Sequence, residues 1–149
     1  MIAQSFGVNH EKKNIETEDK MSSLRILLVD ENNEFKNSAL RFINSRIRFE
    51  SLSWASNGQE ALEKIETIQP TLILIDSSIV EKNGRETIKI IRKLDKNAII
   101  IFLTFENEFN DDKKFLTDQN NYISRTEFTE NIIPMVKKLF GDNVSRMYS

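Results

Sequence analysis

Residues 71–76 read TLILID, a short apolar run that ends in a carboxylate. Two similar runs occur elsewhere: LRILLVDE (Leu24 to Glu31) ends in two acids, and AIIIFLT (Ala98 to Thr104) ends in a hydroxyl. Continuous apolar runs of this length are typical of strands that are covered on both faces, as in a parallel sheet. Weaker strand candidates are Phe49 to Ala55 and Asn121 to Ser124.

Apolar residues at helical spacing separate these predicted strands. The clearest sets are Phe35, Ala39 and Ile43; Ala61, Leu62, Ile65 and Ile68; Ile88, Ile91 and Leu94; and Ile132, Val136, Leu139 and Phe140. Phe109, Phe115 and Leu116 indicate a fourth helix less clearly. Pro134 predicts that the last helix starts near residues 129–131, because a missing N–H costs least in a first turn. Five alternations of strand and helix predict a doubly wound α/β domain with helices on both faces.

The composition is that of a soluble globular protein, with 39% hydrophobic and 30% charged residues. A net charge of −2 gives no general attraction to nucleic acid or to an anionic membrane. No apolar run approaches the roughly 20 residues that span a bilayer. The chain has no cysteine and a single histidine, His10, in a polar stretch. These features favour a cytoplasmic protein without disulfides, thiolate metal sites or histidine catalysis.

The folded domain is predicted to span residues 23–141. Residues 1–22 form a polar N-terminal segment, expected to be a mobile tail or, alternatively, a short docked helix. Residues 142–149 are expected to form a C-terminal tail, too short for a DNA-binding unit. We therefore expect a stand-alone domain, unless the chain is a piece of a longer protein.

Acids and a hydroxyl follow neighbouring predicted strands. Asp30, Glu31, Asp76 and Thr104 are expected at the carboxyl edge of the sheet, where functional groups gather in such folds. Three close acids repel one another, and a hard cation such as Mg²⁺ removes that conflict. An acid beside Mg²⁺ can attack phosphorus, while the Thr104 hydroxyl and the Arg125 guanidinium bind the transferred oxygens. Each acidic run alone also fits solvated turn residues or helix N-caps.

The order and spacing of several segments resemble those of response-regulator receiver domains. These segments are LRILLVDEN (Leu24 to Asn32), ASNGQEALEKI (Ala55 to Ile65), PTLILIDSSIVEKNG (Pro70 to Gly84), IIIFLT (Ile99 to Thr104) and YISR (Tyr122 to Arg125). The resemblance covers most of the chain, and it implies a flavodoxin-like five-stranded sheet with strand order 2-1-3-4-5.

The resemblance also implies a metal site and a phosphoacceptor. Asp76 matches the phosphoacceptor, and Asp30 and Glu31 match the acidic pair that holds Mg²⁺. The backbone carbonyl of Ser78 matches a further metal ligand.

Further positions match switch and tuning residues of the family. Thr104 matches the switch hydroxyl, and Tyr122 matches the aromatic switch residue, although a tyrosine in a short strand is often ordinary packing. Ser78 and Glu106 match positions that tune the lifetime of the phosphoryl group.

Four positions depart from the family pattern. Arg125 stands where the family has lysine. Three roles are open for it: it clamps phosphate, it pairs with Asp76 in the resting state and slows activation, or it is a plain surface arginine. Thr126 and Val80 replace common prolines, so the peptide before Thr126 is expected to be trans and the loop carrying Val80 less rigid. Phe105 replaces a small residue and either narrows access to Asp76 or packs onto the fourth helix.

The leading interpretation is a stand-alone receiver of a two-component system or phosphorelay, and not an ordinary enzyme. It would accept a phosphoryl group on Asp76 from a histidine kinase or histidine phosphotransfer protein, with Mg²⁺. A downstream protein would then bind the face made by the fourth helix, fifth strand and fifth helix, residues 106–140. The sequence leaves open the kinase, the target, the role of residues 1–20 and whether the chain forms homodimers.

Two other interpretations stay open. A pseudo-receiver would keep the fold and bind partners without phosphorylation, and Arg125, Val80 and Phe105 motivate it. A flavin-binding electron carrier of similar topology is disfavoured, because residues 30–33 read DENN and would repel a flavin phosphate.

Overall fold

A computed structural model of the chain describes residues 24–82, 85–104 and 121–146. Its strands form one parallel sheet in the order β2-β1-β3-β4-β5. Their bounds are β1 (Arg25–Val29), β2 (Ser51–Ala55), β3 (Leu72–Asp76), β4 (Ile99–Thr104) and β5 (Tyr122–Ser124). The doubly wound sheet and its predicted strand order are therefore confirmed.

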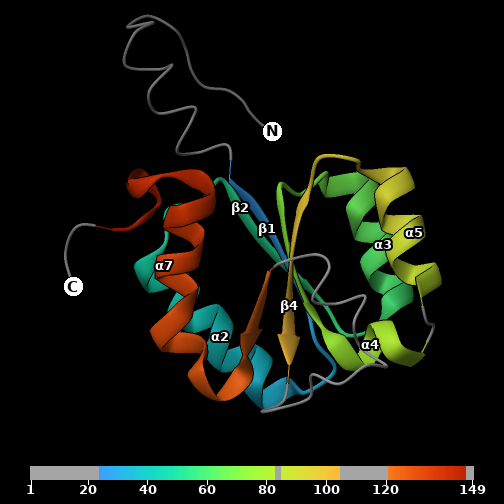
Figure 1. Cartoon of the computed structure of the whole chain (residues 1–149), viewed down its shortest axis with the longest axis horizontal. Helices are drawn as coiled ribbons and strands as arrows, with labels where there is room; N and C mark the ends of the chain where they lie inside the picture. Colours follow the sequence, from blue (N-terminus) through green and yellow to red (C-terminus); the bar gives the residue numbers. More distant parts are fainter. Residues whose placement is uncertain (1–23, 83–84, 105–120, 147–149) are drawn as a thin grey trace, which may run out of the picture.

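Helices cover both faces of this sheet, as predicted (Figure 1). The α-helices are α2 (Asn33–Arg46), α3 (Gly58–Ile68), α4 (Ser77–Lys82), α5 (Arg85–Leu94) and α7 (Phe128–Phe140). Two short 3-10 helices, η2 (Arg125–Glu127) and η3 (Asp142–Val144), flank α7. One face carries α2 and α7, and the other carries α3, α4 and α5. Within the described ranges, no helix has the length and apolar character needed to cross a membrane.

Asparagine side chains cap the two helices that follow the first strands. The Asn32 side chain accepts a hydrogen bond of 2.9 Å from the backbone N–H of Phe35 at the start of α2. The Asn57 side chain accepts one of 2.8 Å from the N–H of Glu60 at the start of α3. Such caps satisfy N–H groups that have no partner inside the helix. The Asn57-Gly58 pair of the sequence therefore lies at the start of α3, with Asn57 as the capping residue.

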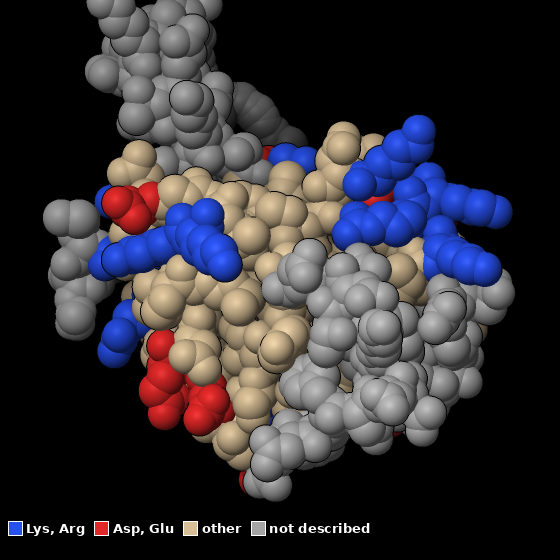
Figure 2. Space-filling view, in the orientation of Figure 1, with Lys and Arg blue, Asp and Glu red and all other residues tan. Residues whose placement is uncertain are grey.

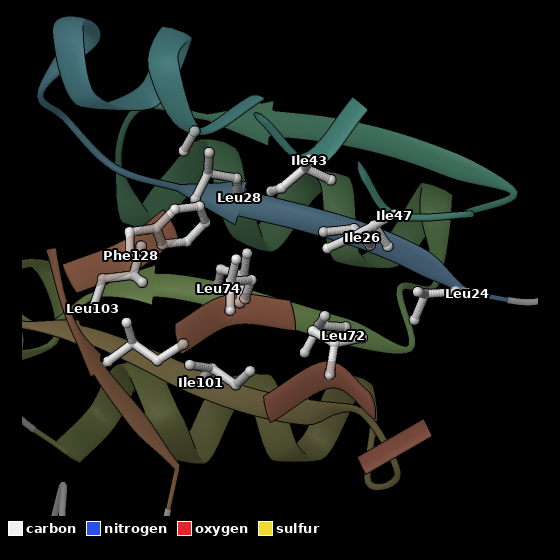
Figure 3. Packing of buried hydrophobic residues seen from close by; sticks show 14 of the residues in the cluster. Leu24, Ile26, Leu28, Ile43, Ile47, Leu72, Leu74, Ile101, Leu103 and Phe128 are labelled. Carbon is white, nitrogen blue, oxygen red and sulfur yellow. The ribbon is translucent and has the colours of Figure 1, made fainter. Parts of the chain in front are cut away.

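Alternate side chains of each inner strand enter two separate hydrophobic cores. The core beneath α2 and α7 takes Ile26 and Leu28 from β1 and Leu72 and Leu74 from β3 (Figure 3). The core beneath α3, α4 and α5 takes Leu27, Val29, Ile73 and Ile75 from the same strands. All eight side chains are fully buried. Burial on both faces explains why the strands read as continuous apolar runs.

The segment after Asp76 is helical, whereas the sequence predicted a loop there. Helix α4 begins at Ser77, directly after β3, and includes Val80. A proline at this position would remove an N–H and crowd the preceding turn of a helix. Valine has no such restriction, so the absence of the family's proline permits a helix. The predicted fourth helix, based on Phe109, Phe115 and Leu116, lies outside the described residues.

Helix α7 begins at Phe128, slightly before the predicted start, and places Pro134 in its interior. The prediction that Pro134 lies in the first turn was wrong. Three buried side chains of α7, Phe128, Ile132 and Val136, pack into the core around the proline. This burial outweighs the propensity cost of about 3 kcal/mol for an interior proline, because tertiary packing supplies most helical stability.

The segment after α7 packs onto the domain, although the sequence predicted a tail from residue 142. Val144 is buried and belongs to the core beneath α2 and α7. Ile47 and Ser145 form an antiparallel bridge, and the N–H of Arg48 donates to the carbonyl of Val144 at 2.7 Å. The described part of the folded unit therefore extends to residue 146.

Replacing Val144 by alanine is expected to lower the free energy of unfolding by about 1–3 kcal/mol, because a buried side chain is truncated. Chemical denaturation with a single fluorescence or circular dichroism probe measures this change. Asn143→Ala, an exposed substitution in the same 3-10 helix, is the control and should change stability by less than about 0.5 kcal/mol. Equal, negligible effects in both variants would mean that this segment does not pack in solution.

Candidate functional site

Two carboxylates and a hydroxyl lie side by side at the carboxyl ends of adjacent strands. Asp30 follows β1, while Asp76 and Thr104 are the last residues of β3 and β4. Their exposed fractions are 0%, 2% and 1%, so all three are buried. The predicted placement of Asp30, Asp76 and Thr104 at one edge of the sheet therefore matches the structure.

Arg125 joins the two carboxylates. Its Nη2 donates hydrogen bonds of 2.7 Å to Oδ1 and Oδ2 of Asp30, and it forms an ion pair of 2.7 Å with Oδ2 of Asp76. The side chain of Arg125 is 6% exposed, although its backbone lies in η2, just after the edge strand β5. One guanidinium nitrogen thus contacts three carboxylate oxygens and neutralises much of their mutual repulsion.

Asp76 also accepts two hydrogen bonds from Ser78. The backbone N–H of Ser78 donates to Oδ1 at 2.9 Å, and its hydroxyl donates to Oδ2 at 2.9 Å. Asp76 directly precedes α4 and caps its first turn through the Oδ1 contact. Both carboxylate oxygens of Asp76 are therefore engaged, and Oδ2 is shared by a hydroxyl and a guanidinium.

Burial raises the pKa of Asp30 above its ordinary value, because the charged form loses its hydration. The neighbouring charge of Asp76 acts in the same direction. A hydrogen bond from the N–H of Asn32, 2.8 Å long, and the guanidinium of Arg125 favour the charged form but do not cancel the effect of burial. The ionised form of Asp30 is therefore a source of instability in the folded domain.

Aromatic rings support Arg125 from the side of α2 and α7. The guanidinium carbon of Arg125 lies 5.2 Å from the centre of the Phe35 ring. That ring meets the ring of Phe128 edge to face, with centres 5.5 Å apart. The sequence indicated Phe35 only as a helical core residue. Its position on the inward face of α2, soon after the acids, was the signal that it could reach this site.

Lys36 is a second residue at this edge of the sheet that was not predicted from the sequence as a site residue. Its side chain is 5% exposed, and its Nζ donates a hydrogen bond of 2.6 Å to the hydroxyl of Ser56, which directly follows β2. Lys36 precedes Ala39 and Ile43 by three and seven residues, so it lies on the buried stripe of α2. A lysine in an otherwise apolar helical stripe was the sequence signal that could have identified Lys36 as a buried charged residue.

The predicted three-acid metal site is only partly assembled. Glu31 is exposed, and in the part of the chain that the structure describes no three acidic, histidine or cysteine residues are grouped to hold a metal ion. Asp30 and Asp76 do converge, with oxygens within 2.7 Å of one shared nitrogen. Their oxygens are the donors that Mg²⁺ prefers, so this pair fits a divalent cation if Arg125 gives way. The role of Glu31 stays a prediction.

Two of the predicted switch residues, Thr104 and Tyr122, lie on the last two strands of the sheet, β4 and β5. Thr104 Oγ1 is buried and has no hydrogen-bond partner among the described residues. Tyr122 is 42% exposed on β5 and stands opposite Phe102 in the sheet register. Phe105 and Glu106 lie outside the described residues, so their predicted roles stay predictions.

Replacing Asp30 by asparagine is expected to raise the free energy of unfolding at pH 7. The folded-state pKa of Asp30 lies above the unfolded value, so ionisation costs stability as pH rises through the folded value. Below the unfolded pKa of about 3.9 both states are protonated, and the advantage of the variant should vanish. Denaturation curves between pH 3 and pH 7 measure the free energy of unfolding of the variant and of the unaltered chain. Glu63→Gln, which changes an exposed acid, is the control. A destabilised Asp30→Asn at pH 7 would contradict it.

The comparisons with known proteins agree with this fold. The family described as response regulator receiver domain matches residues 26–137. Chemotaxis protein CheY of Thermotoga maritima is 38% identical over 77 residues, which are 52% of this chain and 63% of that protein. The first curated relatives are matched over only 20% to 63% of their own length.

Solved structures of other proteins share the fold. A CheY-like response regulator receiver domain protein from Methanospirillum hungatei JF-1 has a TM-score of 0.66 and 20% identity, with 82% of this chain and 97% of that chain covered. In the structure of the P1 domain of CheA3 in complex with CheY6 from R. sphaeroides, the matched chain has a TM-score of 0.63 and 20% identity, with 80% and 97% covered. Because the family profile covers most of the chain and the strand order agrees with it, the chain belongs to the response regulator receiver domain family.

Proposed function

We propose that this receiver accepts a phosphoryl group on Asp76 and reports the change through its surface. The observation that carries the proposal is the convergence on one buried carboxylate, Asp76, of the Arg125 guanidinium and the Ser78 hydroxyl. A buried hydroxyl without a described partner, that of Thr104, ends the adjacent strand. These are the donors that a phosphoryl group needs after transfer.

In the proposed reaction, a carboxylate oxygen of Asp76 attacks the phosphorus of a phosphohistidine. The new bond joins this oxygen to phosphorus, the bond from phosphorus to the donor nitrogen breaks, and the histidine leaves. Arg125 and Ser78 must first release Oδ2 of Asp76, which both contact. Arg125 can then bind the phosphoryl oxygens, and its planar fork suits two of them at once.

Receiver domains generally use Mg²⁺, and Asp30, Asp76 and the backbone carbonyl of Ser78 are the residues that we propose would hold it here. When bound, Mg²⁺ would supply the positive charge that offsets the phosphoryl oxygens and the two acids. Lys36 adds a buried ammonium at the same edge of the sheet and favours anionic ligands there.

The proposed output surface includes β5 and α7. Thr104 would turn toward the phosphoryl group, and the change would reach Tyr122 on the neighbouring strand. Figure 2 shows acidic side chains near the beginning of α7 and basic ones near its end. Glu130 lies in the first turn, and Lys137 and Lys138 lie in the last. This charge pattern suits the helix dipole, and it gives a partner an oriented surface to recognise.

We propose a histidine kinase or histidine phosphotransfer protein as the phosphoryl donor. The solved complex of CheY6 with the P1 domain of CheA3 supports this choice, because it is a receiver-like chain bound to another signalling protein. Receiver domains of this kind are generally not enzymes. A cytoplasmic protein with a protein target and no nucleic-acid target is part of the same proposal.

A phosphorylation-independent binding module is the second candidate function. The contact of Arg125 with Asp30 and Asp76 favours it, because this contact closes the phosphoacceptor edge. The two candidates differ in one measurable property, the ability of Asp76 to form an acyl phosphate.

Incubation with Mg²⁺ and acetyl phosphate or phosphoramidate is expected to add the mass of one phosphoryl group to the intact protein. Asp76→Asn should lose this adduct completely, because an amide is not a nucleophile toward phosphorus. Asp142→Asn removes an exposed acid just after the C-terminal end of α7, and this variant should keep the phosphoryl adduct. Absence of the adduct in the unaltered chain, or its persistence in Asp76→Asn, favours the second candidate.

Thr104→Val is expected to keep or raise the free energy of unfolding, by up to about 1 kcal/mol, because it removes a buried hydroxyl without a described partner. Thr71→Val is the matched control: its hydroxyl accepts a hydrogen bond of 2.9 Å from the N–H of Arg25, so it should lose about 1 kcal/mol. Chemical denaturation measures both changes.

Thr104→Val should still form the phosphoryl adduct, but the phosphodonor should no longer change hydrogen exchange in β5 and α7. A response as large as that of the unaltered chain would show that Thr104 does not transmit the signal.

A further inference from the structure

We propose that Arg125 is a tethered cation that competes with the divalent metal for Asp30 and Asp76, and that it must withdraw into a neighbouring pocket before metal binds. This inference deepens the proposed function and rests on it for the identity of the metal. It assigns a latch to three residues, Arg125, Phe35 and Ser38, that act before any phosphoryl transfer.

The guanidinium and a divalent metal need the same carboxylate oxygens. Nη2 of Arg125 lies 2.7 Å from both oxygens of Asp30 and 2.7 Å from Oδ2 of Asp76. A divalent cation on these carboxylates would bind at about 2.0–2.6 Å from the same oxygens. Two cations cannot share that space, so binding of one requires the other to leave.

An aromatic ring holds Arg125 in place on the side of α2. The Phe35 ring lies 5.2 Å from the guanidinium carbon, and this ring is itself packed edge to face on Phe128. Such a cation–π contact gains strength when it is removed from water, and Arg125 is only 6% exposed. Phe35 therefore biases Arg125 toward the state that occupies the two acids.

The structure also provides a place for Arg125 to go. A pocket of about 130 Å³, partly open to solvent, adjoins Arg125 between α2 and the start of α7. At roughly 30 Å³ for each water molecule, a pocket of this volume has room for a guanidinium group. Its walls include the Phe35 and Phe128 rings and three residues with hydroxyls, Ser38, Thr126 and Thr129, whose oxygens can accept guanidinium hydrogen bonds.

These three observations define two states of one side chain. In the closed state, which the structure shows, Arg125 is ion-paired with Asp30 and Asp76. In the open state Arg125 lies in the pocket, and the acids can take a metal ion. The apparent dissociation constant for the metal equals the intrinsic constant divided by the fraction of open molecules, so any change that empties or blocks the pocket must alter metal affinity.

The decisive variant is Ser38→Leu, which fills the pocket without changing any charge. Ser38 is an exposed residue of α2, and leucine favours helix more than serine does, so folding should be preserved. Isothermal titration of the full chain with Mg²⁺ should show weaker binding than in the unaltered chain. Ser45→Leu makes the same substitution on an exposed part of α2 away from this pocket, and it should bind Mg²⁺ as the unaltered chain does.

Two further variants test the other end of the latch. Phe35→Leu removes the supporting ring and should tighten Mg²⁺ binding by up to about 30-fold, the value of a cation–π contact that is removed from water. Arg125→Met keeps an apolar stem but removes the competing charge, and it should bind Mg²⁺ more tightly than any other variant. Far-UV circular dichroism checks that each variant is folded.

Unchanged Mg²⁺ affinity in Ser38→Leu, or in Arg125→Met, overturns the latch. The phosphodonor assay is read separately from the titration. Shifted Mg²⁺ affinities without any phosphoryl adduct would leave the latch standing and remove the proposed function. An adduct on Asp76 with unshifted affinities would do the reverse.

Discussion

The structure of this site depends on one ion-paired contact, that of Arg125 with Asp30 and Asp76. Two acids buried at adjacent strand ends repel each other and lose hydration, so a cation must lie between them for the edge of the sheet to be stable. Arg125 supplies it from 95 residues away in sequence. The same contact ties the segment after the edge strand β5 to the ends of β1 and β3. Arg125 thus offsets part of the negative charge at this edge of the sheet.

Under the proposed function, a divalent cation or a phosphoryl group that binds at this edge would change the partners of Arg125. A guanidinium differs from the ammonium of the family's usual lysine because it is planar, forked and able to stack on Phe35. The substitution therefore affects how firmly the resting state is held as well as where charge is placed. The short helix α4 adds a second hold, since Ser78 at its start engages both oxygens of Asp76.

Much of the fold could be predicted, because its signals are local. The buried strands read as apolar runs, and the acids and the threonine that end them had to meet at one edge of a parallel sheet. Predictions failed where tertiary packing overrides local preference. Pro134 lies inside α7 because buried neighbours hold that helix, and α4 replaces the expected loop around Val80. Val144 is buried although its segment reads as a polar tail, because its backbone pairs with the segment after α2.

By itself, the sequence determined the sheet, its helices and the identity of the residues at the carboxyl edge. The apolar runs and the residues that end them are local features of the chain, so they can be found without information on distant contacts. Only the tertiary structure showed that the Arg125 side chain is buried and paired with both acids, which excludes a plain surface arginine. It alone also brought Phe35 and Lys36 to the site. The physical reason is that a charged side chain chooses its partner by distance and burial, and both follow from how α2, β5 and α7 pack on the sheet.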